Sequence, residues 1–154
     1  MKMGIFLIVV FSFLSLCCRD IGVEPRALDF SEIPSAQFFR VQQPGTAVFR
    51  SEAEWKAFRD VHFMYILGMP IMPPIADFER EIVIGIFWGT GYGGCRNVTQ
   101  SIERVQIANN VVEVKVGPLS DLGSCKMLVA PLQIVKIPKT DLPVVFVGNV
   151  PQSR

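Results

Sequence analysis

The amino-acid sequence predicts an α+β fold, a mainly antiparallel β-sheet with one principal helix packed on it. Three observations lead to this prediction. Short apolar runs separated by turn residues recur over the second half of the chain, which is typical of strands. One stretch, residues 51–67, has apolar residues at helical spacing. The predicted strands follow one another through short turns, which favours antiparallel neighbours over repeated crossover units.

The size and charge of the chain limit the number of domains and the kinds of partner that it can bind. It has 154 residues, of which 50% are hydrophobic, and this is enough to build the core of one domain. The formal net charge is +1, and basic and acidic residues are interspersed without a long block of one sign. This balance argues against a nucleic-acid partner and against electrostatic binding to an acidic membrane surface.

Residues 1–17 have the form of an export signal. Lys2 precedes an uncharged apolar stretch, Gly4–Cys18, which is shorter than the about 20 apolar residues that a membrane-spanning helix needs. A spanning helix is the alternative. The end of the stretch, Leu14-Ser15-Leu16-Cys17-Cys18, resembles a bacterial lipobox, which predicts lipidation of Cys17. Cleavage by an ordinary signal peptidase, which leaves Cys18 first, is the other interpretation.

A lipidated Cys17 predicts an extracytoplasmic protein of the bacterial cell envelope, such as an outer-membrane lipoprotein, attached to the membrane by its lipid only. Residues 18–45 are then expected to form a polar tether, because they show neither helical nor strand periodicity and contain three prolines. Phe38 and Phe39 could pack back as a short strand. The domain itself is expected over residues 46–150.

The first elements of this domain are a short strand over residues 46–50 and the helix. Ser51-Glu52-Ala53-Glu54 forms a capping box, with a hydroxyl at the cap and a glutamate three residues later. The helix is predicted to run to about Leu67, where Gly68 ends it and the following prolines prevent its continuation. Its predicted apolar face contains Trp55, Phe58, Val61 and Tyr65.

The strands follow the helix. Ile82–Trp88 is continuously apolar, which predicts a central strand covered on both faces, with the helix on one of them. Residues 98–107 fit both periodicities, and their β-branched content favours a strand. Asn109-Asn110 predicts a tight hairpin to residues 111–116. The last strands are expected over residues 126–138, long or bent, and 144–147.

A glycine-rich loop follows the central strand and is the functional candidate. Its glycines permit positive φ angles and the close approach of a partner's backbone. The spacing G-x-G-x-x-G also matches a dinucleotide-binding motif, but no crossover helix follows and Glu113 lies in a predicted hairpin strand. A structural turn and a protein contact are therefore the two interpretations. The predicted partner-binding residues are Gly89, Thr90, Gly91, Tyr92, Gly93 and Gly94.

Cys95 and Cys125 lie in the predicted domain, and an exported protein can keep them oxidised. The sequence predicts that they form a disulfide, which would enclose about 30 residues and anchor the glycine-rich loop. Unpaired thiols or a metal site are the alternatives. A metal site would need further ligands at suitable spacing, and the sequence offers none, so no metal is predicted.

No catalytic constellation is evident, and the protein is predicted to be neither an enzyme nor a cofactor-binding protein. His62 is the only histidine, and it lies within the predicted helix with no nucleophile motif elsewhere. The acidic residues Asp77, Glu79 and Glu81 precede the central strand and are interpreted as solvated residues that face Arg80.

Several motifs resemble, in their order, the C-terminal domain of the protease complex subunit PrcB family. They are the capped helix with Trp55 and Phe58, then Asp77-Phe78 and Glu81 ahead of an apolar strand, then a Thr-Gly loop. Lys136-Ile137-Pro138-Lys139 before the last strand adds to the likeness. The resemblance covers about residues 49–147.

Members of this family look like exported, often lipid-anchored accessory subunits of surface proteases. The resemblance therefore implies a non-enzymatic domain that binds another protein and stabilises or localises a protease. Family loops tend to read Pro-Thr-Gly-Gly-Tyr, so Thr90, Gly93 and Gly94 match the family pattern, whereas Tyr92 is shifted and Cys95 lies near the usual tyrosine. A peptidase inhibitor is the alternative function, because a rigid glycine-rich loop held by a disulfide enters an active-site cleft at little ordering cost.

Overall fold

The computed structural model describes residues 24–34, 36, 39–64 and 76–152. The predicted export signal, the lipidation site Cys17, Phe38 and the predicted helix residues from Tyr65 to Gly68 lie outside these residues. Within them, the chain forms mainly antiparallel sheets and one helix, which confirms the predicted α+β class.

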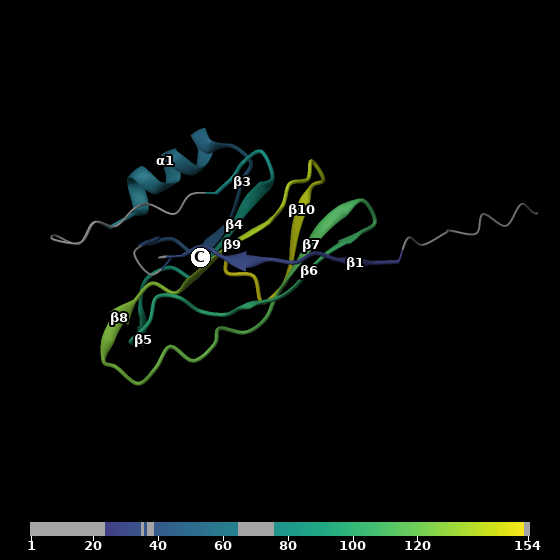
Figure 1. Ribbon diagram of the computed structural model, residues 1–154. Helices are drawn as coiled ribbons and strands as arrows, with labels where there is room; N and C mark the ends of the chain where they lie inside the picture. The colour runs from purple at the N-terminus through teal and green to yellow at the C-terminus, as the bar shows by residue number, and fades with distance from the viewer. Residues whose placement is uncertain (1–23, 35, 37–38, 65–75, 153–154) are drawn as a thin grey trace, which may run out of the picture.

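The molecule has three layers, with helix α1 (Glu52–His62) packed on a central sheet and an outer sheet packed on the other face of the central one (Figure 1). The central sheet has the order β2 (Ser31–Glu32), β9 (Leu132–Pro138), β4 (Glu81–Phe87), β3 (Gly45–Phe49). The outer sheet has the order β1 (Arg26–Ala27), β6 (Ile102–Ala108), β7 (Val111–Val116), β10 (Val144–Gly148). A separate two-stranded ribbon contains β5 (Tyr92–Gly94) and β8 (Met127–Val129).

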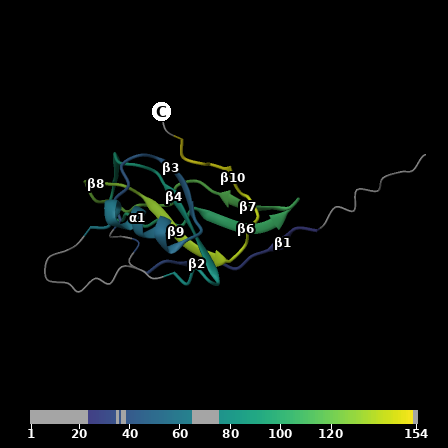
Figure 2. The same cartoon turned by 90° about the horizontal axis from the view of Figure 1, so that it is seen from above.

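The alternation of side chains along β4 explains why this strand is apolar at nearly every position. Ile82, Ile84 and Ile86 point into the core between the two sheets. Val83 and Phe87 point to the other face and join the core beneath the helix. The prediction of a central strand covered on both faces is therefore confirmed. Figure 2 shows α1 and the β6–β7 hairpin on opposite sides of β4 and β9.

The helix begins at the predicted cap, Ser51, and Glu54 reaches back to the backbone, although to Arg50 and not to Ser51. The Ser51 hydroxyl accepts a hydrogen bond from the Glu54 backbone N–H at 3.3 Å, and the Glu54 carboxylate accepts from the Arg50 N–H at 2.7 Å. Trp55, only 1% exposed, anchors the helix on the central sheet, with its ring 5.5 Å from that of Phe39 and 5.2 Å from that of Phe49.

The end of the helix differs from the prediction. It ends at His62 and not near Leu67, because Phe63 is extended, buried, and paired with Phe39 across an isolated β-bridge. Val61 is 75% exposed and does not belong to the buried face. His62 lies on that face in its place, with its ring 4.7 Å from the Phe58 ring.

The part of the expected tether that the structure describes is integrated into the fold. β1 pairs with β6 and β2 pairs with β9, both antiparallel. Ile33, Phe39 and Val41 are buried in the core beneath the helix. The segment looks polar in the sequence because polar residues and prolines separate most of its apolar residues, yet Ile33, Phe39 and Val41 belong to one core cluster.

The later strands follow the predicted order with three differences. Val98 forms only an isolated bridge to Leu132, and the strand after it starts at Ile102. The stretch predicted over residues 126–138 is two strands, separated at Ala130–Pro131. β10 pairs with β7 in parallel, although β6 and β7 form the predicted hairpin with Asn109 and Asn110 at φ 50° and 59°.

Candidate binding site at the ribbon tip

The two strands of the β5–β8 ribbon continue the central pair β4 and β9 beyond the edge of the sandwich. Trp88 donates a backbone hydrogen bond to the Pro131 carbonyl at 2.9 Å, and the antiparallel ladder resumes with Tyr92 opposite Val129. In Figure 1 the ribbon projects away from both sheets. We call the projecting region, residues 89–98 and 122–130, the ribbon tip.

A disulfide between Cys95 and Cys125 closes the far end of the ribbon and confirms the predicted pairing. The two Cα atoms lie 4.9 Å apart, one residue after β5 and two residues before β8. The Cys95 N–H also donates to the Leu122 carbonyl at 2.7 Å. The ribbon tip is therefore held both by the ladder and by a covalent link.

Two of the six residues predicted to bind a partner are buried and serve the fold. Gly89 has φ 75°, and a Cβ there would lie 2.9 Å from the Gln42 carbonyl oxygen. At Gly94 a Cβ would lie 2.6 Å from the Cβ of Leu122. The other four predicted residues, Thr90, Gly91, Tyr92 and Gly93, are exposed on the ribbon tip.

The side chains of Leu128 and Met127 are the most exposed apolar groups of the ribbon tip, at 81% and 58%. Their cross-strand partners are Gly93 and Gly94, so no side chain on β5 covers them. Sequence reasoning missed both residues. The sequence signal for them is the apolar pair Met127-Leu128 shortly after Cys125. Only the register of β8 against β5 shows that this pair lies opposite two glycines.

Two grooves adjoin Leu128. One, of about 530 Å³, lies toward the end of α1, and its lining includes Arg40, Gln42, Met64, Gly91 and Leu128. The other, of about 520 Å³, lies between β8 and the segment Cys95–Val98. Leu128 therefore forms an apolar ridge between two hollows.

Tyr92 lies on the opposite face of the ribbon, because it is adjacent to Gly93, which pairs with Leu128. It lines a third groove of about 790 Å³, together with Trp88, Pro44 and Pro151. The predicted binding residues are therefore divided between two faces of the ribbon tip.

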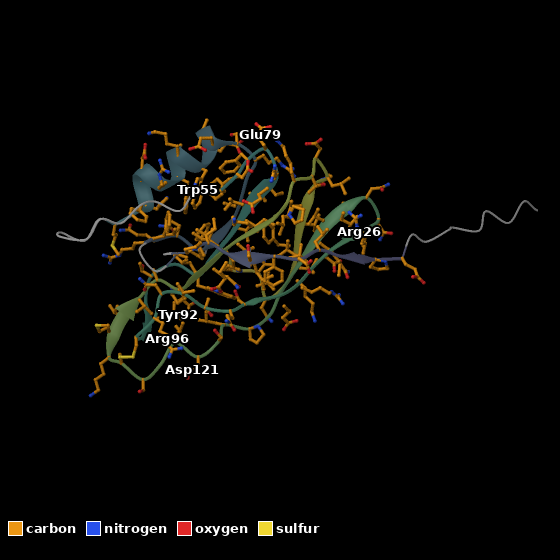
Figure 3. The ribbon with its side chains drawn as sticks, in the orientation of Figure 1. Arg26, Trp55, Glu79, Tyr92, Arg96 and Asp121 are labelled. Atoms are coloured by element: carbon orange, nitrogen blue, oxygen red, sulfur yellow. A yellow bond between two sulfur atoms is a disulfide. The ribbon has the colours of Figure 1, made fainter. Side chains whose placement is uncertain are left out.

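Positive charge surrounds the Leu128 ridge. Arg40, Arg96 and Lys126 are exposed, and no ion pair joins them to the part of the chain that the structure describes. Asp121, which precedes the second segment of the ribbon tip, accepts a hydrogen bond from the Gly123 N–H at 2.8 Å. Figure 3 shows Arg96 and Asp121 near the ribbon and Glu79 at the opposite end of the molecule.

The remaining chemical candidates are engaged in local interactions. The His62 Nδ1 atom lies 3.1 Å from the Arg40 carbonyl oxygen. The Asp77 carboxylate accepts from the Glu79 N–H at 3.1 Å, and Glu81 forms an ion pair with Lys136 at 2.9 Å. Over residues 24–34, 36, 39–64 and 76–152, no group of three or more His, Cys, Asp or Glu side chains is placed to hold a metal ion.

Among the described residues, no helix has the length and apolar character to cross a membrane. Comparison with protein-family models, with curated proteins and with solved structures finds no match to this chain.

Proposed function

We propose that the protein is an exported, lipid-anchored binding domain that docks another protein through the ribbon tip. The observation that carries this proposal is the Leu128 ridge: an 81% exposed leucine on a disulfide-closed ribbon. Large apolar side chains in exposed clusters are typical of protein interfaces. The disulfide lowers the entropy that the ribbon tip loses on binding.

The charge around the ridge indicates the chemistry of the partner surface. Arg40, Arg96 and Lys126 have no described counter-ion, so an apolar side chain flanked by carboxylates fits the ribbon tip. Such complementarity raises association rates more than it raises affinity.

Two further features support the proposed cellular location and the proposed kind of partner. A disulfide such as Cys95–Cys125 persists in oxidising compartments, which supports a location outside the cytoplasm. The resemblance to the PrcB family supports a surface protease as the partner, with this domain as an accessory subunit that stabilises or localises it. Lipidation of Cys17 would then hold the complex at the membrane.

The test is capture of the partner with the full chain and two matched variants. Leu128→Glu places a charge on the ridge, and capture should fall by at least about tenfold, as expected for the centre of an interface. Val61→Glu makes the same change at a 75% exposed position on α1 that lines neither groove beside Leu128, and capture should be unchanged. Equal capture by wild type and Leu128→Glu contradicts the proposal.

A peptidase inhibitor is the second candidate, favoured by the exposed stretch Thr90–Gly93, which the disulfide-closed ribbon presents. The two functions differ in one measurement. Co-purification with an active protease supports the accessory subunit. Loss of peptidase activity at protein concentrations near that of the enzyme supports the inhibitor.

A further inference from the structure

Strand β10 forms one edge of the outer sheet, and β1 forms the opposite edge. Its sequence, Val144-Val145-Phe146-Val147-Gly148, has no charge and no proline. The side chains of Val144 and Phe146 pack against the core between the sheets, whereas Val145 is 43% exposed on the outer face. An apolar edge of this kind is able to pair with another strand.

The backbone of β10 has free hydrogen-bonding groups on this edge. Pro143 accepts from the Val112 N–H at 2.8 Å, and Asn149 donates to the Val116 carbonyl at 2.9 Å, so the odd-numbered residues face β7. Because successive residues alternate their backbone groups between the two sides of a strand, Val144 and Phe146 face away from β7. Among the described residues, no strand pairs with β10 on that side.

The other edges of the two four-stranded sheets differ from β10, and the strands of the β5–β8 ribbon are only three residues long. β1 and β2 are two residues long, and each contains a charged residue, Arg26 and Glu32. β3 is as long as β10, but its sequence Gly-Thr-Ala-Val-Phe is unlike itself when reversed. A two-fold axis at the centre of β10 would place Val145 opposite Val147 of an identical strand, and such an uncharged β-branched pair stabilises strand pairing.

We propose that β10 pairs antiparallel with β10 of a second copy, about a two-fold axis at Phe146. The pairing joins two outer sheets into one continuous sheet. Phe146 exchanges backbone N–H and carbonyl hydrogen bonds with Phe146 of the second copy. An isologous contact of this kind closes as a dimer and leaves no β10 edge free for further growth.

The side-chain pairs follow from this register. Val145 lies opposite Val147 of the second copy on the outer face, and the two β-branched pairs stabilise the contact. The two Phe146 rings are adjacent on the inner face, so the cores between the sheets of the two copies meet at the axis. The surface is distinct from the ribbon tip, and the inference does not depend on the proposed function.

The first test measures the molar mass of the full chain in detergent solution by light scattering, over a range of protein concentrations. As the protein concentration rises, the molar mass of the wild type should change from that of one copy to that of two. Val145→Lys places like charges beside the new strand pair and should raise the dissociation constant of the dimer by at least about tenfold. Val145→Thr keeps a β-branched side chain at the same position and should dimerise like the wild type.

The second test examines the register. In the double variant Val145→Lys, Val147→Glu, each lysine lies opposite a glutamate of the second copy, and dimerisation should return. In the double variant Val145→Lys, Val147→Lys, each lysine lies opposite another lysine, and dimerisation should not return. Residue 145 is exposed on the outer face, so its substitution should leave the monomer folded. Thermal unfolding of each variant verifies this.

Three results overturn the inference. The first is a mass of one copy at every concentration. The second is a Val145→Lys, Val147→Glu variant that dimerises no better than Val145→Lys. The third is a dimer that Leu128→Glu abolishes and Val145→Lys leaves intact, which would place self-association at the ribbon tip.

Discussion

Gly94 lies directly beneath Leu122, whereas its neighbour Gly93 has open space around it. A Cβ at residue 94 would lie 2.6 Å from the Leu122 Cβ, and a Cβ at residue 93 would meet no atom within 4 Å. Within β5, the packing therefore requires a glycine at residue 94, whereas Gly93 lies on an open surface that a partner can contact.

Gly94→Ala should lower the free energy of unfolding by about 1–3 kcal/mol, because the new methyl group overpacks a buried contact. Gly93→Ala should leave it unchanged to within about 0.5 kcal/mol, the usual range for surface substitutions. Denaturant unfolding measures both. Because Gly93→Ala is expected to fold normally, any loss of partner capture by this variant reports a contact at β5. Equal destabilisation by the two variants would contradict the geometry at Gly94.

Gln133 is a buried polar residue whose importance the sequence does not reveal. Its Oε1 atom accepts from the Ser101 N–H at 2.8 Å and from the Ile102 N–H at 2.7 Å. It thereby links β9 in the central sheet to the start of β6 in the outer sheet.

Gln133→Leu should destabilise the protein by about 2–4 kcal/mol, because it leaves two buried backbone donors without an acceptor. Ser101→Ala is the control, since it keeps both backbone bonds and removes only a hydroxyl 3.4 Å from the same oxygen. Its cost should be at most about 1 kcal/mol. Thermal or denaturant unfolding compares the two. Similar costs would show that the backbone donors do not depend on Gln133.

At the scale of elements, we expect the β5–β8 ribbon to depend on the disulfide more than the sheets do. Each of its strands is three residues long and pairs with no other strand of the part of the chain that the structure describes. Strands as short as these are marginal alone. The link between residues 95 and 125 spans 30 positions of sequence and closes the ribbon at its far end.

The double variant Cys95→Ser, Cys125→Ser should lose up to about 3–4 kcal/mol of stability, the value of the loop-entropy model for such a link. Amide hydrogen exchange should become faster in β5 and β8 and change little in β4 and β9. Reduction of the wild type with a thiol should reproduce the pattern. Unchanged exchange in the ribbon after reduction would show that the ladder holds it unaided.

At the scale of the whole molecule, a net charge of +1 conceals an uneven distribution. Arg40, Arg96 and Lys126 lie around the Leu128 ridge without an ion pair to the described residues, whereas at the start of β4 the acids Asp77 and Glu81 are paired with Arg80 and Lys136. A charge pattern of this kind orients the molecule toward an oppositely charged surface.

Association with the partner should therefore slow as ionic strength rises. Lys126→Glu should reduce the association rate constant by about 3- to 10-fold at low salt, and the difference should shrink at high salt. Arg80→Glu makes the same charge change at the other end of β4 and should have a smaller effect. Association kinetics at two salt concentrations measure both. An equal effect of the two variants would indicate net charge and not the ribbon tip.

Prediction from sequence succeeded where the pattern is local. The capping box at Ser51, the Asn109-Asn110 hairpin and the continuous apolar run of β4 each involve residues a few positions apart. The disulfide could also be predicted, because only two cysteines lie in the domain beyond the predicted signal. The ribbon tip was found through its glycines, but its exposed apolar ridge was not.

The sequence by itself determined the α+β class, the start of the helix, the hairpin and the cysteine pair, because backbone preferences and short-range hydrogen bonds act within a few residues. Only the tertiary structure decided that Ile33, Phe39 and Val41 join the core, that β10 lies parallel to β7, and that Leu128 faces a glycine. Each of these depends on strand register and on contacts between distant segments. A one-residue shift of a strand exchanges its buried and exposed faces, and no local pattern in this chain specifies that choice.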